Sequence, residues 1–421
     1  MKDRKTVTKK AHILLFCLIL VITSFGWPST EAKAPDPPPA VGARKSSQKR
    51  VSRSSRKKRR ATSRRRSRRA SRRQSSARRL ARLTRALQEQ VQAAIARDDL
   101  RGEDMEVRQA ALRALGNHAG TAVVMDPQTG RIYSIANQDW ALRQGFTPCS
   151  TIKPYIALAG LKEHLITPSF QLATEQSPLS LSLIDALSRS DNYYFQRIGD
   201  GLGLYKLRRY ASEFGLGQPT GINLPGEVPG RIPDSENMKS SQIALAASHG
   251  RGFEITSLQL AVFTAALANQ GYMYQPQVVT NEFQNQPVGY GEGSGGGNLD
   301  RNLSTESFTP VLQRQINISN IERVNILAGM MGAVEFGTAR LTYDPTIQIA
   351  GKTGTCTGDG GLRLGLFQSF ATVEQPKLVV VVVTQGVHER GPLAAQIAGR
   401  IYQQLADRFQ LRSTPSTISS K

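Results

Sequence analysis

The sequence predicts a mixed domain of helices and one β-sheet, with strands from its two ends forming the sheet and a helical region inserted between them. Three observations predict this. Two β-rich runs flank a Pro/Gly turn within 121–137, a continuous β-branched run covers Leu378–Thr384, and stretches of helical apolar spacing precede and follow these strands. A basic segment without aromatic residues comes before the folded part. We therefore expect one folded domain behind an extended tail.

The first 34 residues have the pattern of a secretory signal peptide or a signal anchor. Basic residues between Lys2 and Lys10 precede an uncharged run from Ala11 to Trp27 that includes ILLFCLILVI. At 1.5 Å per residue this run reaches about 25 Å, slightly less than the ~30 Å hydrocarbon core of a bilayer. Anchor and cleaved signal both stay open for 1–34, and either one predicts export.

The net charge of +23 is concentrated in one segment. Arg44–Arg85 holds 21 Lys and Arg and no acidic residue, whereas the rest of the chain holds 34 Lys and Arg against 32 Asp and Glu. Such a segment repels itself, so we expect 35–79, first Pro-rich and then Arg-rich, to be a disordered linker. Its charge over 44–85 suits a membrane surface or anionic envelope polymers. Without Phe, Tyr or Trp for base stacking, no specific nucleic-acid partner is expected.

Each remaining element follows from a local pattern. A helical lead-in is expected over 80–118, because apolar residues recur at helical spacing through Leu80–Ile95 and again through Met105–Leu115. The β-rich runs within 121–137 predict a hairpin. Leu378–Thr384 should be a strand buried on both faces. A helix should follow this strand, with one apolar stripe formed by Leu393, Ile397, Ile401 and Leu405. The segment GYGEGSGGG, Gly289–Gly297, is expected to be a flexible surface insertion.

The first motif that can carry chemistry is Ser150-x-x-Lys153, in the apolar, helix-forming context FTPCSTIKPYIALAGL. If Ser150 begins a helix, the spacing puts the Lys153 amine one turn on, under the hydroxyl. A lysine desolvated there has a lowered pKa and can take the serine proton, which makes a nucleophile of a serine that has no histidine.

Two further motifs can complete a site. In the second, Ser190 and Asn192 stand two apart; on a loop they can relay a proton and hold a substrate peptide, or they can be an ordinary turn or helix cap. The third is Lys352–Thr355, KTGT. On an edge strand its lysine and glycine point the same way, the glycine allows a substrate backbone to approach closely, and the lysine and threonines suit a carboxylate. A turn with a surface lysine is the alternative.

In this order the three motifs resemble the signature of the penicillin-binding transpeptidase superfamily. The segments AVVMDPQTGRIYSIAN, FGLGQPTGINLPGE, FEITSLQLAVFTAALANQGYMYQP and GAVEFGTA are also similar to that family, and the resemblance covers roughly Ala119 to Leu405. It implies an α+β domain over 119–410, with a five-stranded antiparallel sheet flanked by helices, a helical subdomain and the site between them. A flexible tail would follow over 411–421.

The resemblance also implies an activity: peptidoglycan D,D-transpeptidase-like acyl transfer, with D-Ala released from stem peptides in cell-wall synthesis. β-Lactams would acylate the same serine, and no cofactor or metal is needed. The implied roles are Ser150 as nucleophile, Lys153 as its general base, Ser190 as proton relay, Lys352 as electrostatic support for Ser190, and Asn192, Thr353, Gly354 and Thr355 as substrate-binding residues, the two threonines recognising the carboxylate.

Other functions stay open beside this one. A D,D-carboxypeptidase uses the same site with water as acceptor. A serine β-lactamase needs fast deacylation, yet no Glu-x-x-Leu-Asn segment lies between the second and third motifs. The third is a non-catalytic module that binds β-lactam or peptidoglycan and is tethered by a polyanion-binding tail. Since the implied substrate lies outside the cytoplasmic membrane, we expect a periplasmic domain, anchored or, if the signal is cleaved, secreted.

The cysteines lead to one more hypothesis. Cys149 precedes Ser150 and Cys356 follows the third motif, and the fold implied by the resemblance brings these segments together. A disulfide between them is permitted in an exported protein. Strand alternation can equally point Cys356 away, which would leave two small buried thiols.

Overall fold

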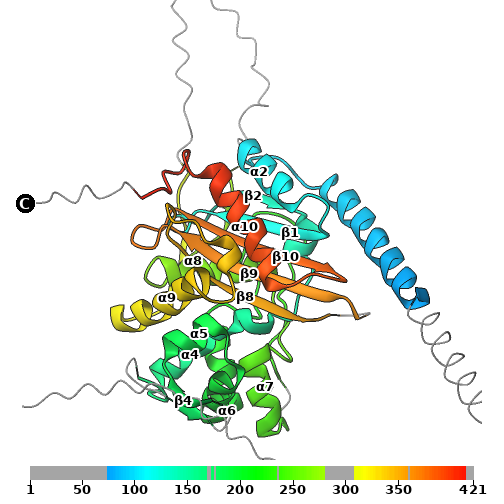
Figure 1. Cartoon of the computed structure of the whole chain (residues 1–421). Helices are drawn as coiled ribbons and strands as arrows, with labels where there is room; N and C mark the ends of the chain where they lie inside the picture. The colour runs from blue at the N-terminus through cyan, green and yellow to red at the C-terminus, as the bar shows by residue number, and fades with distance from the viewer. Residues whose placement is uncertain are drawn as a thin grey trace, which may run out of the picture. The chain divides into compact units, whose positions relative to one another are not determined.

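The computed structural model combines strands from both ends of the folded part in one sheet (Figure 1). It describes residues 74–167, 172–174, 177–234, 237–279, 308–358 and 361–413, with backbone alone for those between 172 and 180. The predicted signal, the linker up to residue 73, the glycine-rich insertion and residues 414–421 lie outside the described residues.

The main sheet has six strands in the order β6-β2-β1-β10-β9-β8. The five from β2 to β8 are antiparallel neighbours, as predicted, and the hairpin of β1 and β2 is confirmed. The sixth, β6, adds a two-residue parallel pairing to β2, too short to leave a pattern in the sequence. The strands are β1 (Gly120–Met125), β2 (Arg131–Ala136), β6 (Gln277–Val278), β8 (Ile349–Thr357), β9 (Arg363–Ala371) and β10 (Leu378–Gly386).

The central strand β10 is buried on both faces, as its β-branched run predicts. Val380 and Val382 pack with α2 (Met105–Leu115) and the apolar stripe of α10 (Gly391–Leu405). On the opposite face, Val379 and Val381 belong to the cluster built around α8 (Ser257–Ala268). The two faces of the sheet therefore carry separate apolar cores.

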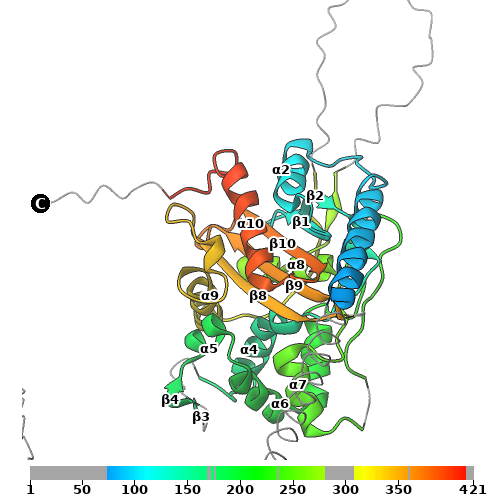
Figure 2. The same cartoon turned by 45° about the vertical axis from the view of Figure 1, so that its right-hand side comes forward.

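A helical region is inserted between β2 and β8, and Figure 2 shows part of it below the sheet. Two short antiparallel strand pairs, β3–β4 and β5–β7, accompany it. Its elements are α3 (Gln138–Leu142), η1 (Cys149–Ile152), α4 (Lys153–Lys162), β3 (Leu172–Thr174), β4 (Ser177–Leu181), α5 (Leu183–Arg189), α6 (Asn192–Glu213, kinked at Gly203), α7 (Ser240–His249), β5 (Tyr272–Tyr274), β7 (Leu312–Gln315), α9 (Asn320–Glu335) and η3 (Arg340–Thr342).

The lead-in helix spans 74–95 and so begins before residue 80, inside the segment that the sequence assigns to the disordered linker. Arg, Gln, Ala and Leu all favour helix, which extends it past the part that packs. Val91 is buried, whereas Leu83 is 38% exposed, so only the second half contributes apolar contacts to the domain. No helix within the described ranges is long and apolar enough to cross a membrane.

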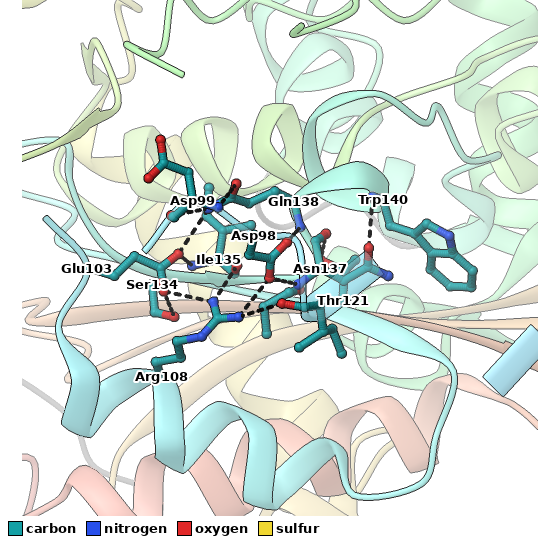
Figure 3. A network of polar contacts seen from close by, with 12 residues as sticks. Asp98, Asp99, Glu103, Arg108, Thr121, Ser134, Ile135, Asn137, Gln138 and Trp140 are labelled. Carbon is teal, nitrogen blue, oxygen red and sulfur yellow. Dashed lines mark hydrogen bonds and ion pairs between the residues drawn. The ribbon is translucent and has the colours of Figure 1, made fainter. Parts of the chain in front are cut away.

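A buried ion network holds the lead-in against the sheet (Figure 3). Arg108 on α2 is 3% exposed, and its guanidinium donates to Asp98 Oδ2 and Glu103 Oε2, each at 2.9 Å. It also donates to the carbonyls of Ile95 and Ile135. The two carboxylates accept further hydrogen bonds from the backbone at the end of β2 and the start of α3. Each charge in the network therefore has several partners.

The C-terminal boundary lies beyond the predicted one. Leu411 is fully buried, and Arg412 forms a β-bridge with Ile347 in the segment before β8. The first residues of the predicted flexible tail (411–421) are therefore part of the domain, because an apolar side chain there completes the core under α10.

Candidate active site

Ser150 lies in η1, a 3-10 turn that continues directly into α4, so the expectation that it begins a helix is confirmed. The preceding residue, Cys149, has a φ of 51°, an uncommon conformation for a non-glycine residue. Gln368 on β9 fixes the turn, since its amide donates to the Thr151 carbonyl at 2.7 Å. Ser150 itself is partly exposed while both its neighbours are buried. This is a serine held by rigid elements and open to a ligand.

Lys153 joins the first motif to the second. Its side chain is fully buried, and Nζ donates to the Ser190 carbonyl at 2.6 Å, to Ser190 Oγ at 3.1 Å and to Asn192 Oδ1 at 2.8 Å. It also lies 5.2 Å from the centre of the Phe195 ring. Within the described residues, the hydrogen bonds of Lys153 go to the second motif and none goes to Ser150. The sequence spacing alone had suggested that the amine lies under the Ser150 hydroxyl.

The second motif is the sharp turn between α5 and α6. Ser190 ends α5 in the left-handed region, with φ 58° and ψ 42°, and Asp191 caps α6 by accepting from the Tyr194 N–H. The motif is therefore a turn and a helix cap, and at the same time it faces Lys153 with a hydroxyl, a carbonyl and an amide oxygen. The two interpretations of its sequence are compatible.

Lys352 brings the third motif to the same place. It lies on β8, the edge strand of the sheet, and is fully buried, with Nζ donating to the Thr353 carbonyl at 3.1 Å. Burial lowers the pKa of Lys352 to about 7. Burial also lowers the pKa of Lys153 well below its usual range; the Lys352 charge lowers it further, and the Asp191 carboxylate opposes this shift. No Asp or Glu of the described part forms an ion pair with either.

Gly354 is required by packing within the domain, whatever its part in substrate binding. A side chain there would come within 2.9 Å of the Pro148 carbonyl oxygen and 3.4 Å of Cys149 Cβ. The glycine thus lets the turn before Ser150 rest on β8. The structure joins Cys149 to Cys356 by a disulfide, with Cα atoms 5.8 Å apart, across the same contact.

The match to a family model decides the classification. The model of the penicillin-binding protein transpeptidase domain matches residues 120–403, about two thirds of the chain. The chain belongs to this family. The transpeptidase domain of Burkholderia pseudomallei penicillin-binding protein 3 has the same fold, with a TM-score of 0.61 and 19% identity over 75% of this chain and 98% of that one.

Two relatives of this penicillin-binding family member show how much is shared. Peptidoglycan D,D-transpeptidase MrdA of Acinetobacter baumannii is 24% identical over 73% of this chain and 54% of its own length. Penicillin-binding protein H of Bacillus subtilis is 29% identical over 59% of this chain and 40% of its own length. The chain thus spans about half the length, or less, of the relatives it matches.

Two residues of this transpeptidase domain that lie near the motifs were not assigned a role from the sequence. Thr338 accepts a hydrogen bond from the Thr353 hydroxyl at 2.6 Å. His249, at the end of α7, is half-buried, and its pKa is lowered by burial and by the charges of Lys153 and Arg251. The segment GAVEFGTA contains Thr338, but it indicates only the family. A single threonine before a strand has no sequence pattern that would predict its contact with Thr353.

Proposed function

We propose that this chain is a serine D,D-transpeptidase that acylates Ser150 with a peptidoglycan stem peptide. The observation that carries the proposal is the pair of buried lysines without carboxylate partners at the junction of the three motifs. Lys153 as an ammonium donates its N–H groups to three acceptors of the second motif, and losing one proton leaves Nζ a lone pair that can accept a proton. Its lowered pKa makes that form more accessible than in an exposed lysine.

The reaction runs in two halves. Ser150 Oγ attacks the carbonyl carbon of the penultimate D-Ala while Lys153 Nζ takes its proton. The backbone N–H groups of Ser150 and Thr355 receive the oxyanion. The C–N bond to the terminal D-Ala then breaks, and the departing amine receives a proton through Ser190. An acceptor amine finally attacks the ester, forms a new amide and returns the proton to Ser150.

Time-resolved intact-mass spectrometry of the full-length chain with benzylpenicillin tests the proposal. We expect a persistent adduct on Ser150 that Ser150→Ala abolishes. A short-lived adduct with released penicilloate would favour a β-lactamase, and the absence of any adduct on folded protein would leave a non-catalytic binding module. Incubation with a stem peptide, with and without an added acceptor amine, separates an amide product from simple hydrolysis by a carboxypeptidase.

We assign the catalytic domain to 119–410 with the short extension to Ser413, and we place it outside the cytoplasmic membrane, because its substrate is there. The apolar run 11–27 would direct export as an anchor or a cleaved signal. Fractionation of cells that express the full-length chain, followed by sequencing of its N-terminus, distinguishes an intact anchor from a cleaved signal. A cytoplasmic, uncleaved chain would contradict the placement.

The partner proposed for residues 44–85 is an anionic surface, a membrane or an envelope polymer. Within the described part of that segment, Arg78, Arg79, Arg82 and Arg85 are all exposed on one helix. Their charge favours anionic lipid, and the attraction is screened by salt. Co-sedimentation with phosphatidylglycerol vesicles, neutral phosphatidylcholine vesicles and purified wall polymer tests this. Replacing the four arginines by Gln should weaken binding to the anionic samples alone; equal binding to neutral vesicles would contradict it.

A further inference from the structure

Thr338 connects the second and third motifs. It follows α9, and its backbone N–H donates to the Ser188 carbonyl, two residues before Ser190, at 3.2 Å. Its hydroxyl meets the Thr353 hydroxyl at 2.6 Å, with Thr353 as donor in this structure. One residue therefore contacts the end of α5 through its backbone and the KTGT strand through its side chain.

The position of Thr338 is set by close packing on its N-terminal side. A side chain at Gly337 would come within 2.2 Å of the Ser188 carbonyl oxygen, and one at Gly332 within 2.3 Å of Ser188 Oγ. These contacts leave no room for the segment to shift toward α5. The Thr338 hydroxyl is consequently presented to Thr353 by rigid backbone.

Thr353 is confined from the other side as well. It is 4% exposed, and a side chain at Gly391, the first residue of α10, would come within 2.7 Å of Thr353 Cβ. A β-branched side chain enclosed in this way keeps one rotamer. The direction in which its hydroxyl donates is then decided by its neighbours, and Thr338 is the side chain that bonds to it in this structure.

We propose that Thr338 is a positioning residue that sets the Thr353 hydroxyl for the carboxylate of the substrate, an inference that rests on the function proposed above. Hydroxyls both donate and accept, so the bond can reverse. In the free site Thr353 donates to Thr338. When a carboxylate arrives, Thr353 donates to it and accepts from Thr338, so that the hydrogen bond between the two hydroxyls is kept with its direction reversed.

The test compares Thr338→Val, which keeps the shape and the backbone bond but removes the hydroxyl, with Thr338→Ser, which restores a hydroxyl. The readout is the ratio of acylation rates with benzylpenicillin and with its methyl ester, which has no anionic carboxylate. Loss of one hydrogen bond predicts that Thr338→Val lowers the rate with the acid about three- to tenfold and the rate with the ester less than about twofold. Thr338→Ser should restore most of the ratio.

Thr342→Val is the matched control. Thr342 is also buried in the segment before β8, and its hydroxyl has no hydrogen-bond partner among the residues that the structure describes. This variant should leave the acid-to-ester ratio unchanged. A merely structural role for Thr338 would lower both rates together in Thr338→Val, and would overturn the proposal.

A double variant with Thr353→Val tests whether Thr338 acts through Thr353. If it does, the two substitutions together lower the acid-to-ester ratio no further than Thr353→Val alone, and independent, multiplying effects would contradict the proposal. Wild-type protein that forms no adduct would refute the proposed function. Wild-type protein that reacts normally beside a Thr338→Val variant with an unchanged ratio would refute this inference alone.

Discussion

Among the residues that the structure describes, buried cations occur in two groups with opposite surroundings. Arg108, under the lead-in, has two carboxylates at 2.9 Å and two carbonyls as partners. Lys153 and Lys352, between the sheet and the helical region, have only uncharged acceptors. All three side chains are 3% exposed or less.

The difference corresponds to what each group can do. An arginine stays protonated, so its burial requires compensating anions, and these hold the lead-in on the domain. A lysine can instead lose its proton, and leaving it without an anion makes that loss easier. The pKa of Lys352 falls to about 7 and that of Lys153 is also strongly lowered. We infer that the lack of an ion-pair partner equips Lys153 for proton transfer, with the Asp191 carboxylate opposing the loss of its proton only in part.

The sharpest test of this comparison is Lys153→Met. If Lys153 is the general base, acylation by benzylpenicillin should slow by roughly 10²–10⁴-fold. Stability should fall only moderately, because the acceptors that lose their donor are uncharged and no carboxylate loses an ion-pair partner. Acylation kinetics and denaturant unfolding of the same preparations measure both. Strong destabilisation would show that the lysine is a structural cation like Arg108, and the contrast would be lost.

The reverse experiment is Arg108→Met. It leaves Asp98 and Glu103 buried without their cation, so we expect a loss of about 3–5 kcal/mol in the free energy of unfolding. The matched control is Arg97→Met, which removes a single ion pair of an arginine whose side chain is 68% exposed and should cost less than about 1 kcal/mol. Urea unfolding measures the free energy of unfolding of both variants. Similar losses in the two would contradict the assigned role of the network.

These two regions also show what the sequence could and could not predict. Ser150, Ser190 and Lys352 could be proposed from the sequence because each belongs to a short contiguous motif. The hairpin and β10 could be predicted because their patterns are local. The bond from Lys153 to the second motif joins residues 37 apart, and nothing in either motif specifies it. Thr338 and Arg108 acquire their roles only through tertiary packing.

The ionisation of Lys352 gives a pH test of intermediate size. If this lysine must carry its charge to support Ser190, acylation should fall about tenfold per pH unit above a midpoint near 7, where the pKa of Lys352 lies. Arginine stays charged throughout, so Lys352→Arg should remove this basic limb even if its larger size lowers the maximum. A basic limb that persists in Lys352→Arg would assign the titration to another group.

The pair of His118 and Glu389 lies between the fully paired Arg108 and the lysines without an ion-pair partner. It gives the smallest expected effect. His118 Nδ1 lies 2.9 Å from Glu389 Oε1, while Glu389 Oε2 is buried without a partner in the described part of the structure. The hydrogen bond to Glu389 raises the pKa of His118 above 6.5. Because the pKa of His118 is higher in the folded than in the unfolded chain, the pair gives its full stabilisation at pH values below the unfolded-state pKa. That stabilisation is lost as the pH rises through the folded-state pKa.

The variant His118→Gln should therefore be less stable than wild type at about pH 5.5 and nearly equal to it at about pH 8.5. The side chain is 33% exposed, so screening by solvent keeps the difference below about 1 kcal/mol. Thermal unfolding at both pH values measures it. A stability difference that grows with pH would mean that neutral His118 stabilises Glu389. The partly buried Glu389 carboxylate would then not require a charged partner.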